Sequence, residues 1–327
     1  MKRWMPLWAG ALWTTALVAW AVSCGCDDAD TAPLPAPEPP REVETELRYV
    51  LTATLDAGME QLNGIALDAE DRLYLAGSAG VRVLDAGGNV LRAFPTPEAA
   101  ICLAVDEAGN IYVGLQRSVE VYDGEGSLLA SWGGEGEFSY VTGIAVDGLN
   151  VYVCDAGNRL VHRYADNGDF INHLGARDAA EGYPGLVCPS PHLDCAVDGE
   201  GIVHVANPGL LRVERWKADG ERLDTWGTPG ARPEGFFGCC NPTDIALTGE
   251  GRVVTSEKGI PRVKVYDAQG KMLAYLGPQN FSPKVKGMDL AVDSRGRICV
   301  ADPGDGQVRV FELAEAEQPD EPEREGE

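Results

Sequence analysis

Four cysteines form two closely spaced groups in the second half of the chain. Cys188 and Cys195 bracket the stretch "CPSPHLDC", which also holds His192, and Cys239 and Cys240 are adjacent in "GCCNPTD". Outside the cytoplasm such thiols predict disulfides, although four cysteines allow three pairings and one pairing joins Cys239 to Cys240. The same thiolates, with His192 as an added ligand, could form a soft metal site for zinc or copper. A thiol redox centre is the third interpretation.

Carboxylates mark a second candidate site. Asp194, Asp244 and Asp289 open three successive copies of a repeated sequence. Three carboxylates at equivalent positions could line a channel and hold a cation, or each could accept hydrogen bonds from backbone amides. Other candidate ligand contacts, which follow the second apolar run of their repeats, are Glu257, Lys258 and Asp302. Glu257 and Lys258 could instead form a surface ion pair.

An internal repeat sets the positions of these residues. A "GIAVD"-like run, a turn and a second apolar run occur six times, in 64–77, 102–115, 143–155, 194–207, 244–257 and 289–302. The copies are spaced by roughly 40 to 50 residues, which is typical of a four-stranded propeller blade. The sequence therefore predicts an all-β fold, a six-bladed β-propeller.

The repeats also predict how the ring closes. Each copy contains alternating apolar runs separated by Asp- and Gly-rich turns, as in an antiparallel meander. The sixth copy lacks a fourth run, whereas one additional run, 49–58, lies before the first copy. We therefore expect the strand from Tyr49 to Leu55 to pair with Val308–Phe311 in the last blade, because closure removes open sheet edges.

The third repeat, "GIAVDGLNVYVCDAGNRLVHRYADNGDFINHLG", resembles an NHL repeat, and the resemblance covers roughly 47–313. The first two repeats lack the D-x-G-N-R segment, and the fifth has Thr248 in place of the aspartate. The resemblance implies an NHL-type six-bladed propeller, a fold that carries enzymes, sensors and adaptors. Some NHL propellers are lyases that hold zinc with three histidines at the channel. Only His192 is expected at the mouth here, so that activity is not implied.

Antiparallel strands place two kinds of connection on one face of the propeller, around the mouth of the central channel. These are the loops between second and third strands and the loops that lead into the next blade. Two of the latter, 175–194 and 227–244, are long. Long loops on one face of a repeat protein are typical of binding sites. At least one of Cys239 and Cys240 is expected to lie close to Cys188 on this face.

Composition narrows the possible partners. The chain of 327 residues has a net charge of −24. Because an acidic surface repels phosphates, nucleic acid is not an expected partner. The sequence contains no G-x-S-x-G elbow, H-E-x-x-H pair or phosphate loop. A non-catalytic role is therefore favoured, without excluding an enzyme.

Residues 1–23 have the features of a bacterial export signal, with two basic residues followed by a long apolar run. The run ends at "AVSC", which resembles a lipobox with Ser23 before Cys24, although Ala21 stands where leucine is usual. This resemblance implies lipidation of Cys24. A soluble secreted protein and an uncleaved membrane anchor are the alternatives.

Two segments are too polar to bury a core. Residues 24–46, rich in proline and acids, predict an extended tether, and 314–327 predict a disordered acidic tail. The propeller is expected over 47–313.

These features predict a protein exported to the bacterial cell envelope and tethered to the membrane through its N-terminus. Its propeller is expected to act as a binding or scaffold module for a protein, peptide or small ligand at the channel mouth. The alternative is a metal- or thiol-dependent enzyme whose site is the mouth lined by cysteines and aspartates.

Overall fold

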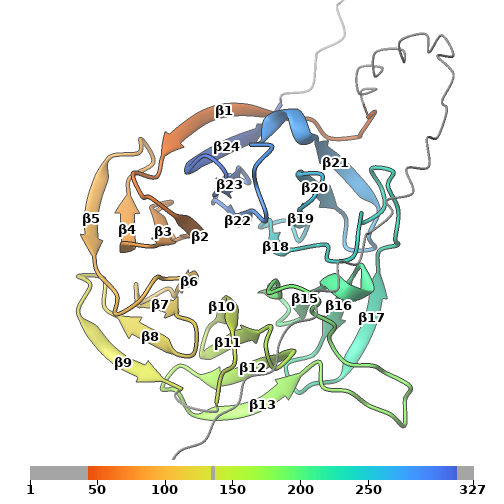
Figure 1. The fold of residues 1–327 in the computed structure, drawn as a ribbon, viewed down its shortest axis with the longest axis horizontal. Helices are drawn as coiled ribbons and strands as arrows, with labels where there is room; N and C mark the ends of the chain where they lie inside the picture. Colours follow the sequence, from red (N-terminus) through yellow and green to blue (C-terminus); the bar gives the residue numbers. More distant parts are fainter. Residues whose placement is uncertain (1–42, 134–136, 315–327) are drawn as a thin grey trace, which may run out of the picture. The chain divides into compact units, whose positions relative to one another are not determined.

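The structure is a computed structural model that describes residues 43–133 and 137–314. Six four-stranded antiparallel sheets form a ring around a common axis (Figure 1). The six-bladed propeller expected from the repeats is therefore confirmed. The predicted export signal, Cys24, most of the tether and nearly all of the acidic tail lie outside the described residues. Within the described part of the chain, there is no helix with the length and hydrophobicity needed to cross a membrane.

The strands follow the same order in each blade, from the axis outward. The innermost strands are β2 (Leu62–Leu67), β6 (Cys102–Val105), β10 (Val141–Asp147), β14 (Asp194–Val197), β18 (Asp244–Leu247) and β22 (Asp289–Val292). The second strands are β3 (Leu73–Gly77), β7 (Ile111–Gly114), β11 (Asn150–Asp155), β15 (Val203–Asn207), β19 (Val253–Glu257) and β23 (Ile298–Asp302).

The outer half of each blade is built from the third and fourth strands. The third strands are β4 (Gly80–Leu84), β8 (Val119–Tyr122), β12 (Leu160–Ala165), β16 (Arg212–Trp216), β20 (Arg262–Tyr266) and β24 (Gln307–Leu313). The outermost strands are β5 (Val90–Phe94), β9 (Leu128–Trp132), β13 (Phe170–Leu174), β17 (Arg222–Trp226), β21 (Met272–Leu276) and β1 (Tyr49–Asp56). Two short 3₁₀ turns, η1 (Pro208–Leu210) and η2 (Pro278–Asn280), lie in the connections.

The ring closes through β1, as predicted. β1 is the outermost strand of the sheet β1-β24-β23-β22, and it pairs antiparallel with β24. The register places Leu51 opposite Phe311 and Leu55 opposite Val308, which is the expected pairing. A strand from the N-terminus therefore completes the last blade in sequence.

The hairpin between the first two strands explains the repeated aspartate. Asp198 Oδ1 accepts hydrogen bonds from the backbone amides of Glu200 and Ile202, both at 3.0 Å. Thr248 takes the same position in the fifth repeat, and its hydroxyl oxygen accepts the amide of Arg252 at 3.1 Å. This turn needs a short side chain with an oxygen acceptor, so threonine can replace aspartate without loss of the hairpin.

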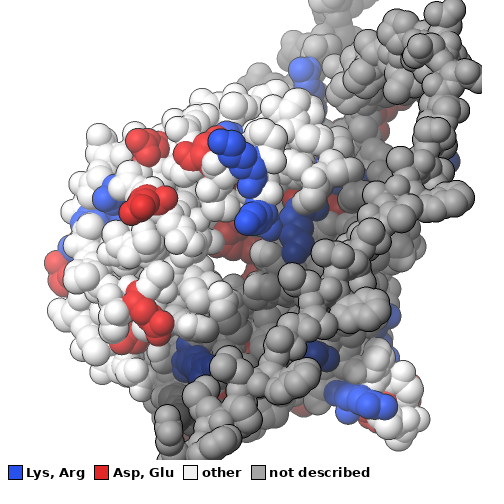
Figure 2. Space-filling model, in the orientation of Figure 1, with Lys and Arg blue, Asp and Glu red and all other residues white. Residues whose placement is uncertain are grey.

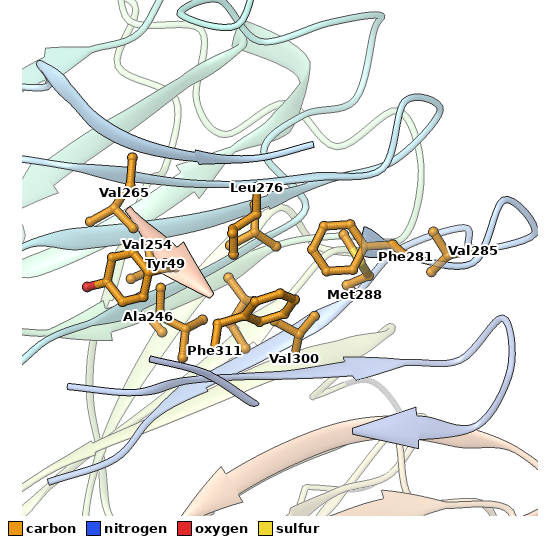
Figure 3. Close-up of a cluster of buried hydrophobic side chains, with 14 residues drawn as sticks. Tyr49, Ala246, Val254, Val265, Leu276, Phe281, Val285, Met288, Val300 and Phe311 are labelled. Carbon is orange, nitrogen blue, oxygen red and sulfur yellow. The ribbon is translucent and has the colours of Figure 1, made fainter. Parts of the chain in front are cut away.

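Apolar side chains between neighbouring blades form the core. Figure 3 shows the contact between the fifth and sixth blades, where Tyr49 of β1, Val265 of β20 and Phe311 of β24 belong to one buried cluster. Phe311 is fully buried, and Phe281 from the loop before β22 lies 5.8 Å from it between ring centroids. Packing between blades therefore fixes where the innermost strands meet at the axis.

Candidate functional site

A cavity of about 690 Å³ opens at the axial ends of the innermost strands. We refer to it as the mouth cavity. All six blades contribute to its lining, through Asn63, Ile101, Thr142, Leu193, Thr243 and Met288 among others. The lining comes from the loops between blades and between second and third strands, which are the loops expected around the channel mouth. Figure 2 shows a hollow near the middle of this face, with Lys and Arg side chains gathered at one side of it.

The three candidate aspartates lie at the first position of adjacent innermost strands, β14, β18 and β22. Asp194 Oδ2 accepts the amide of Ile245 in the next blade at 3.2 Å, and Asp289 Oδ2 accepts the amide of Ile65 at 2.6 Å. These two carboxyls therefore connect neighbouring blades by accepting backbone amides, which is the second of the two roles expected from the sequence. A Cβ atom at Gly143 would lie 2.0 Å from Asp194 Oδ1, so glycine at the start of β10 makes room for this carboxyl.

Asp244 is different from its two neighbours. It lines the mouth cavity and is 6% exposed. Its carboxyl accepts no backbone amide of the described residues and instead shares hydrogen bonds with the carboxyls of Asp289 and Asp194. Burial raises the pKa of the Asp244 carboxyl well above its usual range, and the negative charges of Asp289 and Asp194 raise it further. Burial, followed by the charge of Asp289, also raises the pKa of Asp194 to about 8. The three carboxyls therefore form a buried acidic group that retains protons near neutral pH.

This acidic group predicts an unusual pH dependence of stability. Because the folded pKa of Asp194 is raised to about 8, the folded state holds a proton that the unfolded state has lost. The free energy of unfolding should therefore fall as pH rises from about 6.5 to about 8, by up to about 1.4 kcal/mol per pH unit for each extra proton. The depressed pKa values of His192, His173 and His204 act in the opposite direction, but only below about pH 6.5.

Urea unfolding at a series of pH values measures this slope. The Asp194→Asn variant should reduce it, since an amide does not titrate. A free energy of unfolding in the wild type that is flat or rises between these pH values would contradict the prediction.

Basic side chains border the mouth cavity on one side. His192 lines the cavity beside Gly287, and burial together with the charge of Lys258 lowers the pKa of His192 to about 4. Lys258, which was expected as a ligand contact, is not among the residues that line the cavity, and its Nζ donates to Ser190 Oγ at 2.6 Å. Lys284 and Lys286 line the cavity and are exposed. His192 is therefore a neutral imidazole at pH 7, and the positive charge at this rim comes from lysines.

Glu257 and Asp302 do not lie at the cavity, in contrast to the expectation. Each is the last residue of a second strand, and each is fully buried. Asp302 accepts the amide of Ser282 at 2.7 Å and an Arg309 N–H at 2.8 Å. The aspartate of the D-x-G-N-R segment, Asp155, accepts the amides of Ser139 and Tyr140 in the same way. This position anchors the loop that enters the blade, so these carboxylates have a structural role.

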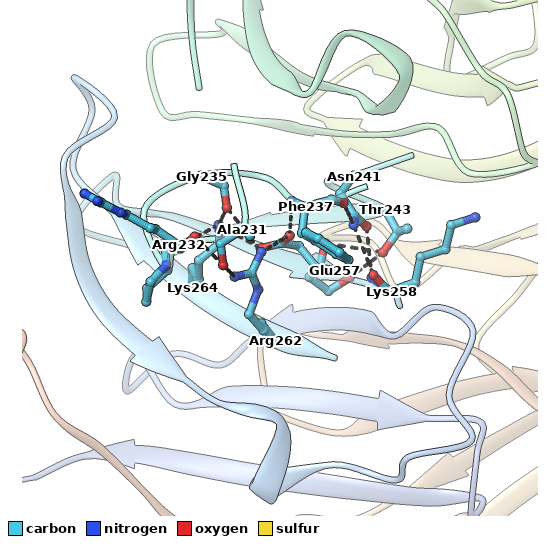
Figure 4. Close-up of polar contacts among 12 residues, drawn as sticks. Ala231, Arg232, Gly235, Phe237, Asn241, Thr243, Glu257, Lys258, Arg262 and Lys264 are labelled. Carbon is cyan, nitrogen blue, oxygen red and sulfur yellow. Dashed lines mark hydrogen bonds and ion pairs between the residues drawn. The ribbon is translucent and has the colours of Figure 1, made fainter. Parts of the chain in front are cut away.

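Glu257 anchors its loop through buried charges (Figure 4). Its carboxylate lies 2.5 Å from Arg262 Nη2 and 2.7 Å from Lys264 Nζ. It also accepts the amide of Phe237 at 2.9 Å. Arg262 and Lys264 each donate to the carbonyl of Gly235. Glu257 thus pairs with these two cations and not with Lys258.

The structure brings the two cysteine loops together around η1. The Val187 carbonyl accepts the amide of Gly209 at 2.7 Å, and the Pro208 carbonyl accepts the amide of Asn241 at 3.2 Å. The residues next to Cys188 and Cys240 in sequence are thereby bonded to the same turn. Burial raises the pKa of the Cys188 thiol to about 12, and the electrostatic interaction with Cys240 also raises it.

All seven cysteines that the structure describes are free thiols. Sγ of exposed Cys239 lies 3.2 Å from Sγ of buried Cys240, without a bond. Cys195 turns inward and packs with Cys154 between two blades. Within residues 43–133 and 137–314, no group of three or more His, Cys, Asp or Glu side chains is arranged to hold a metal ion. The predicted disulfide is therefore not formed in the structure, and a zinc or copper site is not assembled among the described residues.

The long loops contribute less to the cavity than their length suggested. Only their last residues line it, including His192 and Thr243. Tyr183 and Phe236, from the middle of each loop, pack into the cores between blades. Lys284 and Lys286 were not among the residues expected at the cavity, although they precede Asp289 in the loop equivalent to the one that holds His192. Their position in the loop just before an innermost strand was the sequence feature that could have identified these two lysines.

Comparison with known proteins extends only to the fold. No protein-family model matches the chain, and no curated protein matches its sequence. Among solved structures, the chain resembles the WD40 β-propeller domain of Doa1, with a TM-score of 0.54 and 16% sequence identity. The match covers 77% of this chain and 78% of that chain. At this identity, the comparison shows a β-propeller and nothing about activity.

Proposed function

We propose that this protein is an NHL-type propeller that binds a ligand at its mouth cavity and acts as a binding or scaffold module in the bacterial cell envelope. The observation that carries the proposal is the cavity itself. Its volume of about 690 Å³ lies within the range of ligand sites. Because loops from all six blades line it, no single blade could form it alone. β-Propellers are a fold on which sites for many functions are built, so the site must carry the functional argument.

The mouth cavity also supports binding through its chemistry. Apolar side chains such as Leu193 and Met288 lie beside a few polar groups, which is the usual composition of a ligand pocket. No serine nucleophile with an adjacent histidine base is present among the lining residues that the structure describes. A binding role therefore needs fewer additional assumptions than a catalytic one.

A cavity-filling substitution tests this proposal. The Gln116→Trp variant places a large ring at an exposed position of the lining, and it should abolish capture of the partner or ligand from solubilised envelope. The matched Gln269→Trp variant changes an exposed position in the β20–β21 hairpin, at the opposite end of the propeller. Captured material that is lost with Gln269→Trp as readily as with Gln116→Trp would exclude the cavity as the binding site.

We further propose that Cys24 carries a lipid that tethers the propeller to the membrane. The basic start, the apolar run and the sequence "AVSC" before a polar segment support this proposal. Mass spectrometry of the mature protein should find an acylated N-terminal Cys24, and Cys24→Ala should release the protein from the membrane fraction. An intact Met1 terminus in the membrane would indicate an uncleaved anchor instead.

A thiol-dependent activity at the same face is the second candidate, and the distance between Sγ of Cys239 and Sγ of Cys240 favours it. Because Cys239 is exposed, a disulfide oxidant such as oxidised glutathione should convert the two thiols to a disulfide, with reduction of the oxidant to two thiols. Peptide mapping should locate the loss of two hydrogens between these residues. The Cys188→Ser variant should behave like the wild type, and a mixed disulfide that persists on Cys239 would contradict paired reactivity.

A further inference from the structure

We propose that the rim of the mouth cavity binds an anionic group, a carboxylate or a phosphate ester, through Lys284 and Lys286, with Lys258 nearby. The rest of the ligand would be an apolar stem that enters the cavity. This inference names the ligand chemistry of the binding role proposed above, and it rests on that role.

The lysines at this rim differ from the other lysines that the structure describes. The others each pair with a glutamate, and they are Lys217, Lys264 and Lys271. Lys258, Lys284 and Lys286 form no salt bridge with a carboxylate among the described residues, although the chain has 51 acidic residues. Their positive charge is therefore available to a ligand.

His192 shows that these lysines share one side of the cavity. A Cβ atom at Gly287, the residue after Lys286, would lie 2.7 Å from His192 Cε1, so the two loops are in close contact. Lys258 is held by Ser190 Oγ, 2.6 Å from its Nζ, and its charge contributes to the lowered pKa of His192. The basic side chains in Figure 2 gather at one side of the hollow. The potential there is therefore positive in a protein that is acidic as a whole, and it attracts an anion.

The loop that carries Lys284 and Lys286 is fixed by packing. Val285, between the two lysines, is buried and belongs to the same core cluster as Phe281 and Met288 (Figure 3). The two lysines on either side of Val285 are exposed and line the cavity. Because the backbone of this loop is already anchored, an anion would not have to order it, and this lowers the entropic cost of binding.

The interior of the cavity suits an apolar stem and not a second anion. Apolar Ile101, Leu193 and Met288 line it. Asp244 and Asp289 line it as well, so a second anionic group at the floor would meet carboxyls in place of cations. Burial raises the pKa of both carboxyls, which reduces the negative charge of the floor near neutral pH. We therefore infer a ligand whose charge lies at the rim and whose apolar part points to the floor.

The exposed carboxylate of the lining lies at another part of the mouth. Glu98 belongs to the loop before β6 in the second blade, whereas Lys284 and Lys286 precede β22 in the sixth blade. The first blade lies between these two positions in the ring. An anion at the lysines is therefore separated from Glu98 by the width of a blade.

The wild-type protein provides the first test, with the methyl group of Met288 as the reporter. In protein labelled at its methionine methyls, hexanoate and hexyl phosphate should shift the Met288 resonance on titration at pH 7, with Met288→Leu for assignment. Hexylamine and 1-hexanol have the same stem without the negative charge and should bind at least about tenfold more weakly, because a charge-assisted hydrogen bond is lost. Binding of hexylamine or 1-hexanol that equals the binding of both anions would overturn the proposal.

Variants supply the second test. A double variant, Lys284→Gln with Lys286→Gln, should weaken binding of hexanoate and hexyl phosphate at least about tenfold. Both positions are exposed, so the urea midpoint should stay near that of the wild type. The matched control, Lys217→Gln with Lys271→Gln, makes the same change in net charge at exposed hairpins at the opposite end of the propeller. It should leave affinity within about twofold, since distant surface charge is screened. Equal weakening by the two double variants would reduce the effect to net charge and overturn the site.

The two anions separate the sources of the charge. At least about tenfold tighter binding of hexyl phosphate would support a phosphate ester, and the reverse order would support a carboxylic acid. Failure of this inference is distinguishable from failure of the proposed function. Partner capture that Gln116→Trp abolishes but the Lys284 and Lys286 double variant preserves would retain the binding role and reject the anion. Anion binding that needs the two lysines, without any capture that depends on Gln116, would do the opposite.

Discussion

Deletion of residues 47–58 should cause this propeller to aggregate. The deletion removes β1, which pairs with β24 over seven residue positions and supplies the fourth strand of the last blade. It also removes Ala57, which is fully buried, and Tyr49, which packs in the core between the fifth and sixth blades. The remaining β24 would present unpaired amides and carbonyls next to an opened apolar core, and such an edge recruits other chains.

Size-exclusion chromatography and the soluble yield measure this outcome. The matched control deletes 315–327, a segment of similar length that follows β24, and this variant should stay soluble. A synthetic peptide of residues 47–58, added during refolding, should restore soluble protein if strand pairing is the cause. A 47–58 deletion that is soluble and as heat-stable as the wild type would contradict closure through β1.

The Glu257→Gln substitution should cost about 3–5 kcal/mol of the free energy of unfolding, because it leaves buried cations without an anion. Glu257, Arg262 and Lys264 are at most 1% exposed, and Glu257 is the carboxylate that pairs with both cations. Burial already lowers the pKa of Lys264 to about 8 despite this partner. Without Glu257, the pKa of Lys264 should fall further, and the loop carrying Gly235 and Phe237 should open.

Urea unfolding of the wild type and the variant measures the loss, and amide hydrogen exchange at Phe237 locates it. The Glu221→Gln variant is the control, because it breaks an exposed pair with Lys217 and should leave the free energy of unfolding nearly unchanged. A similar small loss in both variants would show that the buried pairs add little to the stability of the loop.

The fold could be predicted from the sequence because its determinants are local and repeated. An acceptor oxygen of Asp198 or Thr248 closes the first hairpin of its blade, and alternation of apolar residues places the strands. Ring closure by Tyr49–Leu55 followed from counting one missing run and one spare run. Each of these features depends on a short stretch of chain, so it can be predicted from the pattern of residue types.

Part of the candidate site could also be predicted, because the repeat fixes which residues begin the innermost strands. His192, Asp244 and Asp289 do line the mouth cavity. Glu257 and Asp302 were expected as ligand contacts, but they anchor loops inside the blades. A carboxylate at the end of a second strand can point to the channel or into the blade. The choice depends on partners such as Arg262 and Arg309, which come from the third strand of the same blade.

Only the tertiary structure decided what differs between equivalent positions. Asp194, Asp244 and Asp289 occupy the same place in three repeats, yet two carboxyls accept an amide from the next blade and Asp244 hydrogen-bonds to the other two carboxyls. Likewise, Tyr183 and Phe236 fill cores between blades, so the long loops that carry them leave the cavity open. The repeated sequence determined the six blades and their closure. The chemistry at the axis was decided by packing between blades, because side chains from six separate strands meet there at distances that no single repeat encodes.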